Sequence, residues 1–95
     1  MKQYLDTIQT LALIELGFPQ PKSVSKLTLD VDMNFIPNFS YSIGELIEML
    51  GVHLSSIYYI GIEWFVNAEG IECRKAELIN ALYDMIVKLI EEGVI

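Results

Sequence analysis

A long amphipathic helix near the C-terminal end limits the folds open to this chain. Apolar residues recur there every three or four positions, which places their side chains on one stripe of a helix that needs a core to pack against. Gly93 is the expected end, because glycine adopts the left-handed backbone of a helix C-terminus without strain. A helix over residues 72–92 would span on the order of 30 Å, so the other elements must pack along it. The stripe consists of Ile79, Leu82, Tyr83, Ile86, Leu89 and Ile90.

Two shorter helices are marked by their ends. Residues 6–16 suit a helix capped by Asp6, with Gln9 in capping-box spacing and Gly17 as the left-handed end. Ser42 and Glu45 have the same capping-box spacing at the start of a second helix, which Gly51 closes after about two turns. These signals predict helices at both places.

Two segments have strand patterns. Residues 26–33 alternate between apolar and polar side chains, as in a half-buried strand, and residues 35–39 continue this pattern weakly until Pro37 breaks it. Residues 57–66 are dense in β-branched and aromatic residues and are predicted to form the longest strand, with Gly61 at a bulge or a close contact.

One face of the predicted strand over residues 57–66 is a candidate contact surface. Strict alternation places Tyr58 and Trp64 on one face and Tyr59 and Phe65 on the other. The second face is apolar enough to be covered, for instance by another copy of the chain. Tyr59, Phe65 and the neighbouring Trp64 are therefore the candidate interface residues.

Together these elements predict a single α+β domain over residues 1–95. The expected order is helix–strand–helix–strand–helix, with a two-stranded sheet packed by three helices. Two strands alone are marginally stable, so the sheet is expected to be extended across a dimer or covered by the helices. Parallel and antiparallel pairing both stay open, because the connection between the strands is long enough for a crossover.

The composition suggests an oligomer. Hydrophobic residues make up 53% of the 95-residue chain, which is more apolar surface than a small monomer easily hides. We therefore expect a homodimer or another protein-binding face. The formal net charge of -7, with six scattered Lys and Arg residues, argues against nucleic acid as a partner.

No segment has the pattern of a membrane span or of a secretory signal. The longest uncharged run, residues 49–62, is too short for a span and contains two glycines. The N-terminal residues lack a basic region and a cleavage site. We expect a cytoplasmic protein, and its single cysteine fits a reducing compartment.

Asp30, Asp32 and Asn34 have the spacing of the first half of a calcium loop. The rest of that motif is missing, because Phe35 stands where glycine is needed and Tyr41 where a bidentate glutamate is needed. Two carboxylates on the solvent face of an alternating strand explain the spacing. Asp30 and Asp32 are thus only weak candidates for a metal site.

The only histidine and the only cysteine could in principle form a base and a nucleophile. Cys73 is expected at a helix N-terminus beside Arg74, a position that would lower the pKa of its thiol. Nothing in the sequence brings His53 close to Cys73. The chain also lacks a glycine-rich phosphate loop, a zinc-type cysteine pair and the hydrolase motifs, so we expect no cofactor and no catalytic residues.

Three segments resemble small uncharacterised proteins of gut Bacteroides and of their phages and prophages. The segments are the helix ending at Leu16-Gly17-Phe18, residues 41–50, and residues 77–85 with the end at 92–95. Their motifs are helix caps and core patterns, so the resemblance transfers no activity to any residue. It implies a bacterial or phage origin and a cytosolic setting.

Three functions follow as hypotheses. The leading one is a non-catalytic interaction module that self-associates through the long strand or the helices. The second is an acidic regulator or inhibitor that binds a basic protein surface, which would need its carboxylates on one contiguous face. The third is a metal-dependent enzyme using Asp30 and Asp32.

Overall fold

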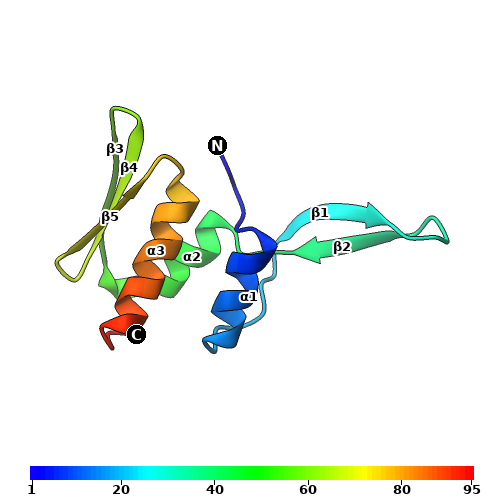
Figure 1. Ribbon diagram of the computed structural model, residues 1–95, viewed down its shortest axis with the longest axis horizontal. Helices are drawn as coiled ribbons and strands as arrows, with labels where there is room; N and C mark the ends of the chain where they lie inside the picture. Colours follow the sequence, from blue (N-terminus) through cyan, green and yellow to red (C-terminus); the bar gives the residue numbers. More distant parts are fainter.

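The computed structural model describes residues 1–95 and contains three α-helices, a short 3₁₀ helix and five strands (Figure 1). The α+β class is confirmed. The predicted helix–strand–helix–strand–helix order and the single two-stranded sheet are wrong. In chain order the elements are α1 (Thr7–Glu15), β1 (Val24–Leu29), β2 (Phe35–Phe39), α2 (Ile43–Leu50), η1 (Gly51–His53), β3 (Leu54–Ile60), β4 (Glu63–Ala68), β5 (Ile71–Lys75) and α3 (Leu78–Glu91).

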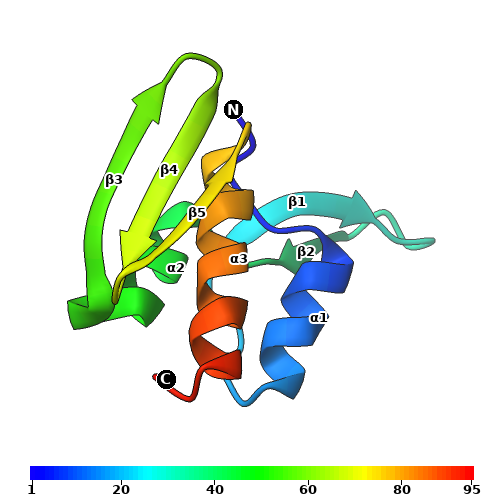
Figure 2. The same ribbon diagram turned by 60° about the vertical axis from the view of Figure 1, so that its left-hand side comes forward.

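The strands form two separate antiparallel sheets. The first is a two-stranded hairpin of β1 and β2, and the second is a meander in the order β3-β4-β5. Figures 1 and 2 show the hairpin projecting from one end of the molecule and the meander covering the other, with the helices between them. The two predicted strands whose pairing direction the sequence left open do not pair with each other, because they belong to different sheets.

The predicted strand over residues 57–66 is a hairpin. It turns at Gly61, whose φ of 67° is left-handed, and Ile60 then pairs with Glu63 across the turn. Apolar and aromatic residues are dense on both sides of the turn, which is why the sequence reads as one strand, but the turn exchanges the faces on which odd and even positions lie. Direct cross-strand partners share a face, so Tyr58 lies beside Phe65.

The predicted helix over residues 72–92 begins later than expected. Residues 71–75 form β5, which pairs with β4 after a two-residue turn at Glu69 and Gly70 with φ values of 51° and 76°. The helix α3 starts only at Leu78. Its predicted end is confirmed, because Gly93 has a φ of 73°.

The predicted strand over residues 26–33 is also shorter. β1 ends at Leu29, the chain loops back over residues 30–34, and β2 pairs with β1. The segment that the sequence indicated only weakly is therefore a full strand. Pro37 is tolerated in it because both strands of a two-stranded hairpin are edge strands.

The predicted helix caps are confirmed. The Asp6 side chain accepts a hydrogen bond from the Gln9 N–H at 2.7 Å, and the Gln9 side chain accepts one from the Asp6 N–H at 3.2 Å. Ser42 and Glu45 form the same capping box at α2. Gly17 and Gly51 end α1 and α2 with φ values of 99° and 51°.

The hydrophobic core lies between α3, α2, α1 and the inner face of the meander. α3 supplies half of its 14 buried side chains, whereas β1 and β2 supply none. The radius of gyration is 14.6 Å, against about 12.4 Å expected for a compact chain of this length. The hairpin that projects from the core accounts for this difference. The buried residues of α3 are Leu78, Ile79, Ala81, Leu82, Met85, Ile86 and Leu89.

Candidate functional site

One face of the β1–β2 hairpin is apolar and uncovered. Leu29 pairs with Phe35 and Leu27 with Pro37, so these side chains lie on the same face. Phe35 is 67% exposed and Leu27 is 59% exposed, although side chains of this kind are usually buried. We call this surface the apolar face. It consists of Val24, Leu27, Leu29, Phe35, Pro37 and Phe39.

The opposite face of the hairpin is more polar. Thr28 pairs with Ile36, and Lys26 pairs with Asn38. The Asn38 side-chain amide donates a hydrogen bond to the Thr28 hydroxyl at 2.7 Å. The hairpin thus has one apolar face and one more polar face, like a strand pair that covers a hydrophobic core. No other part of the chain packs against the apolar face.

The loop at residues 30–34, which we call the tip, is held by Asp30. One carboxylate oxygen of Asp30 accepts hydrogen bonds from the main-chain N–H groups of Asp32 and Asn34, both at 2.9 Å. The expectation that Asp30 and Asp32 lie on a strand face is wrong, because both belong to this loop. Their spacing therefore serves a turn. No group of three or more His, Cys, Asp or Glu side chains is placed to share a metal ion.

Glu45 fixes the base of the hairpin to α2. Its carboxylate accepts hydrogen bonds from the Lys22 N–H at 3.0 Å, from the Ser23 hydroxyl and from the Ser42 N–H at 3.1 Å. Burial raises the pKa of this carboxyl, but the hydrogen bonds outweigh burial and the net pKa is lowered. One ionised side chain therefore caps a helix and holds the start of the hairpin.

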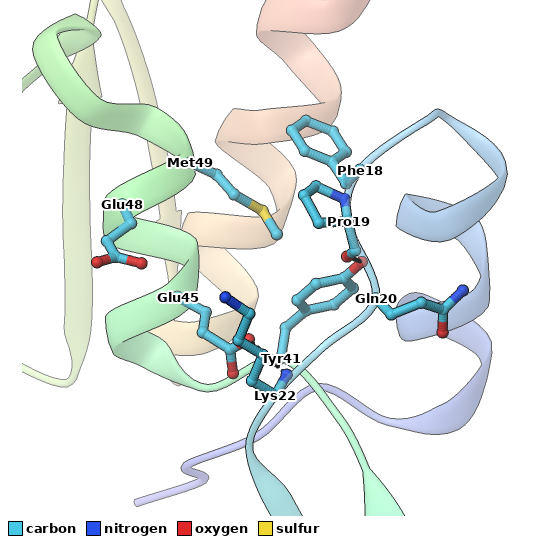
Figure 3. A pocket seen from close by; sticks show the side chains of 8 residues that line it. All are labelled: Phe18, Pro19, Gln20, Lys22, Tyr41, Glu45, Glu48 and Met49. Atoms are coloured by element: carbon cyan, nitrogen blue, oxygen red, sulfur yellow. Dashed lines mark hydrogen bonds between the residues drawn. The ribbon is translucent and has the colours of Figure 1, made fainter.

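Beside Glu45 lies a cavity of about 340 Å³. Figure 3 shows Met49 of α2 reaching toward Phe18 and Pro19, whereas Glu48 points away from them. The Tyr41 hydroxyl at its floor donates a hydrogen bond to the Pro19 carbonyl oxygen. Burial, and secondly the Glu45 carboxylate, raise the pKa of Tyr41. The Tyr41 phenol is thus a neutral structural donor and not a base.

A second cavity, of about 290 Å³, lies where the hairpin meets α1. We call it the crook pocket. One of its lining residues is Thr10, which is 5% exposed and whose hydroxyl has no hydrogen-bond partner. An unpaired buried hydroxyl costs about 1–3 kcal/mol. The pocket is lined by Thr7, Thr10, Leu11, Ile14, Gln20, Pro21, Ser25, Lys26, Asn38, Phe39 and Ser40.

The outward side of α1, next to the crook pocket, is also apolar. Ile8 is 81% exposed and Leu11 is 53% exposed, whereas Leu13 on the inner side is fully buried. A surface helix usually turns polar residues to the solvent. The exposed side of α1 therefore continues the uncovered apolar surface of the hairpin.

The structure separates the predicted interface residues. The Tyr59 and Trp64 rings are tilted with centroids 5.1 Å apart, and the Tyr58 and Phe65 rings stack at 5.0 Å on the opposite face of the meander. Tyr59 is 53% exposed, whereas Trp64 packs against the core. Tyr59 and Phe65 do not share one face as the sequence suggested.

His53 and Cys73 do not form a catalytic pair. The His53 Nδ1 atom lies 2.8 Å from Glu69 Oε1, so the histidine is bonded to the β4–β5 turn. Cys73 lies on β5, where burial, and then the Asp84 carboxylate, raise the pKa of its thiol. The prediction of a helix N-terminal cysteine with a lowered pKa is wrong.

Comparisons with models of known protein families, with curated proteins and with solved structures find no match. No helix of the chain combines the length and the apolar character that crossing a membrane requires.

The apolar face could have been recognised in the sequence. Apolar residues stand on both sides of a short loop that contains Asp30, Asp32 and Asn34, residue types that favour turns, and this is a hairpin pattern. The predicted strand over residues 26–33 ran through this loop to Met33, so the hairpin was not predicted. Nothing in the sequence indicates that the completed hairpin lies away from the core.

Proposed function

We propose that the protein is a small non-catalytic module that self-associates, and that the apolar face of the hairpin is the contact surface. The observation that carries this proposal is the exposure of a complete apolar strand-pair face. Leu29 is 49% exposed and Phe39 is 49% exposed, although both belong to a face with the composition of a protein core. A second copy of the chain carries the same surface, so a symmetric contact pairs apolar with apolar.

The size of the surface supports the proposal. Six side chains that are about half exposed amount to roughly 500 Å² of apolar area, which is in the range of the largest patch on a soluble monomer and marks contact sites. Eight of the exposed large hydrophobic residues of the chain fall between Val24 and Phe39. If a second copy of the chain covers these side chains, much of the apolar surface that the hydrophobic composition leaves exposed is buried.

The other hypotheses have less support. Acidic residues occur on α1, the tip, α2, β4, β5 and α3, whereas an acidic regulator needs them on one surface. One Asp30 oxygen holds the tip, and no three His, Cys, Asp or Glu side chains gather there to share a metal ion, so a metal-dependent enzyme has less support. A cytosolic setting and a bacterial or phage origin stay predictions from the sequence.

The test is the solution mass by light scattering during size exclusion at two well-separated concentrations. We expect a mass of twice 10.8 kDa for the unchanged chain. Leu29→Asn should shift the mass toward the monomer, because a symmetric dimer loses the side chain twice, at about 1.5–3 kcal/mol each.

Ile36→Asn is the matched control. Ile36 is 48% exposed on the same hairpin, almost as exposed as Leu29, but it lies on the opposite face. This variant should keep the dimer mass. A monomer for the unchanged chain at both concentrations, or equal loss of the dimer in both variants, would contradict the proposal.

A further inference from the structure

We infer that the outer edge of β3 is a docking site for an extended, basic segment of a partner protein, which binds by adding a strand to the meander. This site is separate from the proposed self-association, because β3 and the apolar face of the β1–β2 hairpin lie at opposite ends of the molecule (Figure 1). A dimer formed through the hairpins would therefore present two such edges to partner proteins.

β3 is the one strand at a sheet edge that has neither a charged residue nor a proline. Edge strands expose main-chain N–H and C=O groups that can pair with another chain, and charged residues or proline usually prevent this pairing. β1 contains Lys26, β2 contains Pro37, and β5 contains Glu72, Arg74 and Lys75. β3 has seven residues and is the longest strand of the chain. Nothing in its sequence hinders the addition of a strand.

The main-chain groups of Ile57 and Tyr59 are free on this edge. Ile60 pairs with Glu63 across the two-residue turn, so these two residues bond to each other, and in an antiparallel pair every second residue does the same. Tyr58 therefore bonds to β4, whereas Ile57 and Tyr59 direct their N–H and C=O groups away from it. Neither of them makes a main-chain hydrogen bond outside the sheet. The free groups recur at every second residue, which is the spacing that another extended main chain satisfies.

The helices leave this edge uncovered. α3 packs against β4 and β5, and Figure 2 shows β3 on the side of the meander that lies away from α3. β3 therefore keeps exposed side chains on both of its faces. Tyr59 is 53% exposed on the face toward α3, and Ile60 is 62% exposed on the outer face. The side chains of an added strand would lie directly beside them and cover both.

The charges around β3 favour a basic segment. On the outer face Glu63 lies opposite Ile60, and the Tyr58 hydroxyl donates a hydrogen bond to Glu72 Oε1 at 3.2 Å. The two basic residues of the meander lie on β5, at its other edge. A Lys or Arg side chain of an added strand, placed opposite Tyr58, would lie along that ring and reach the Glu72 carboxylate. This charge complementarity favours a basic segment over a second copy of this acidic chain.

The register predicts the sequence pattern of the partner segment. An antiparallel arrangement gives the more stable ladder. Residues opposite Ile57 and Tyr59 then lie on the face toward α3, beside apolar side chains, so we expect them to be β-branched or aromatic. Residues opposite Tyr58 and Ile60 lie on the outer face near two carboxylates, so we expect them to be Lys or Arg. The partner segment thus alternates between apolar and basic residues.

The test uses a dye-labelled synthetic peptide in which lysine and valine alternate, Lys-Val-Lys-Val-Lys-Val-Lys, and measures its binding to the full chain by fluorescence anisotropy. In the inferred register the valines lie opposite Ile57 and Tyr59 and donate their main-chain N–H groups to β3, whereas the N–H groups of the lysines point away. Methylation of the valine main-chain nitrogens removes these donors and keeps every charge and side chain. Methylation of the lysine main-chain nitrogens is the matched control.

We expect the valine-methylated peptide to bind about tenfold more weakly than the unmethylated peptide, because it loses at least two hydrogen bonds, and the lysine-methylated peptide to bind within about twofold of it. Equal binding of all three peptides would show that charge attraction alone holds them, and this would overturn the inference. Absence of binding by the unmethylated peptide would overturn it as well.

Tyr59→Pro removes a hydrogen-bond donor from the protein side of the contact. The Tyr59 N–H points away from β4, so proline takes no hydrogen bond from the sheet, and proline is tolerated on edge strands in this orientation. Peptide binding should be lost, whereas Tyr59→Val, which keeps the N–H group, should retain most of it. Circular dichroism checks that both variants are folded. The methylated peptides test the same contact on the unchanged chain, should the proline variant not fold.

Two further variants separate the parts of the contact. Glu63→Gln should weaken peptide binding by about two- to fivefold, as the loss of an exposed charge contact does, whereas Glu91→Gln on α3 should leave it unchanged. Leu29→Asn, which separates the proposed dimer, should bind the peptide as the unchanged chain does, so the two proposals can fail independently. Loss of the dimer mass in Tyr59→Pro and not in Leu29→Asn would show that a second copy occupies the β3 edge, and it would overturn both.

Discussion

Glu45 Oε2 accepts a hydrogen bond from the main-chain N–H of Lys22 at 3.0 Å, across 23 residues of sequence. The other oxygen of this carboxylate caps α2 through Ser42 and also binds Ser23. A side chain that a sequence pattern assigns to helix capping therefore also holds the base of the projecting hairpin. This one charged group therefore links the start of α2 to the base of the hairpin.

Glu45→Gln tests the role of that charge. The pKa of Glu45 is lowered in the folded state, so its ionised form stabilises the fold at pH values above its ordinary value of 4.5, and this contribution is lost as the pH falls through the lowered pKa. The unchanged chain should lose stability with acidification more steeply than Glu45→Gln. Thermal unfolding across this range measures the difference. Glu48→Gln, on the exposed side of the same helix, should keep the slope of the unchanged chain.

Removing the hairpin tests its independence from the core. Residues 27–37 are replaced by Asn-Gly, which joins the paired residues Lys26 and Asn38 by a two-residue turn. In dilute solution, where the proposed dimer dissociates, the unfolding free energy should change by less than about 1 kcal/mol, as for surface changes. Denaturant unfolding followed by circular dichroism is the measurement. Leu89→Ala in the core should lower the unfolding free energy by about 2–5 kcal/mol. An equal loss of unfolding free energy in the shortened chain would contradict the independence of the hairpin from the core.

Two glycines should respond to alanine in opposite directions. Gly61 has a φ of 67° in the β3–β4 turn, and a Cβ there meets no atom within 4 Å, so the cost is conformational alone, at about 1–2 kcal/mol. Gly44 lies within α2, where the nearest atom to a new Cβ is at 3.9 Å, so Gly44→Ala should stabilise by up to about 1 kcal/mol. Thermal unfolding of both variants gives the signs. Stabilisation by Gly61→Ala would contradict the hairpin turn.

Cys73 should be a slow nucleophile. Burial, and then Asp84, raise the pKa of its thiol, and only the thiolate reacts with alkylating agents. The pH midpoint of its alkylation by iodoacetamide should lie above the ordinary value of 9.0. Asp84→Asn removes an anion and should lower this midpoint. A midpoint below the ordinary value in the unchanged chain would point to a reactive thiol.

Local signals in the sequence predicted the ends of the helices correctly. The capping boxes at Asp6 and Ser42 and the glycine at position 93 act over three or four residues, so the sequence alone contains the interaction. The turn at Gly61 and the strand that follows Gly70 were missed. In both places apolar residues recur past the turn, and only pairing with a neighbouring strand distinguishes two short strands from one long strand or from the start of a helix.

The sequence predicted the type of candidate site, an uncovered apolar surface, but not the segment that carries it. The excess of apolar residues indicated an uncovered surface, but composition does not say which segment lies away from the core. The sequence pointed to Tyr59 and Phe65, whereas the most exposed apolar surface is on the hairpin around Leu29 and Phe35. Which apolar surface stays exposed depends on which strand faces α3 covers, and this is decided by tertiary packing.

The placement of half of the buried core residues on α3 affects the order of events during synthesis. When the chain leaves the ribosome, the hairpin emerges well before residue 78, and the earlier elements have nothing central to pack against until α3 follows. Domains generally fold as units, so the nascent chain should stay open until that helix is available. A two-stranded hairpin is marginally stable by itself, and Glu45 of α2 holds its base, so two copies can pair through their hairpins only after the C-terminal helix has completed each core.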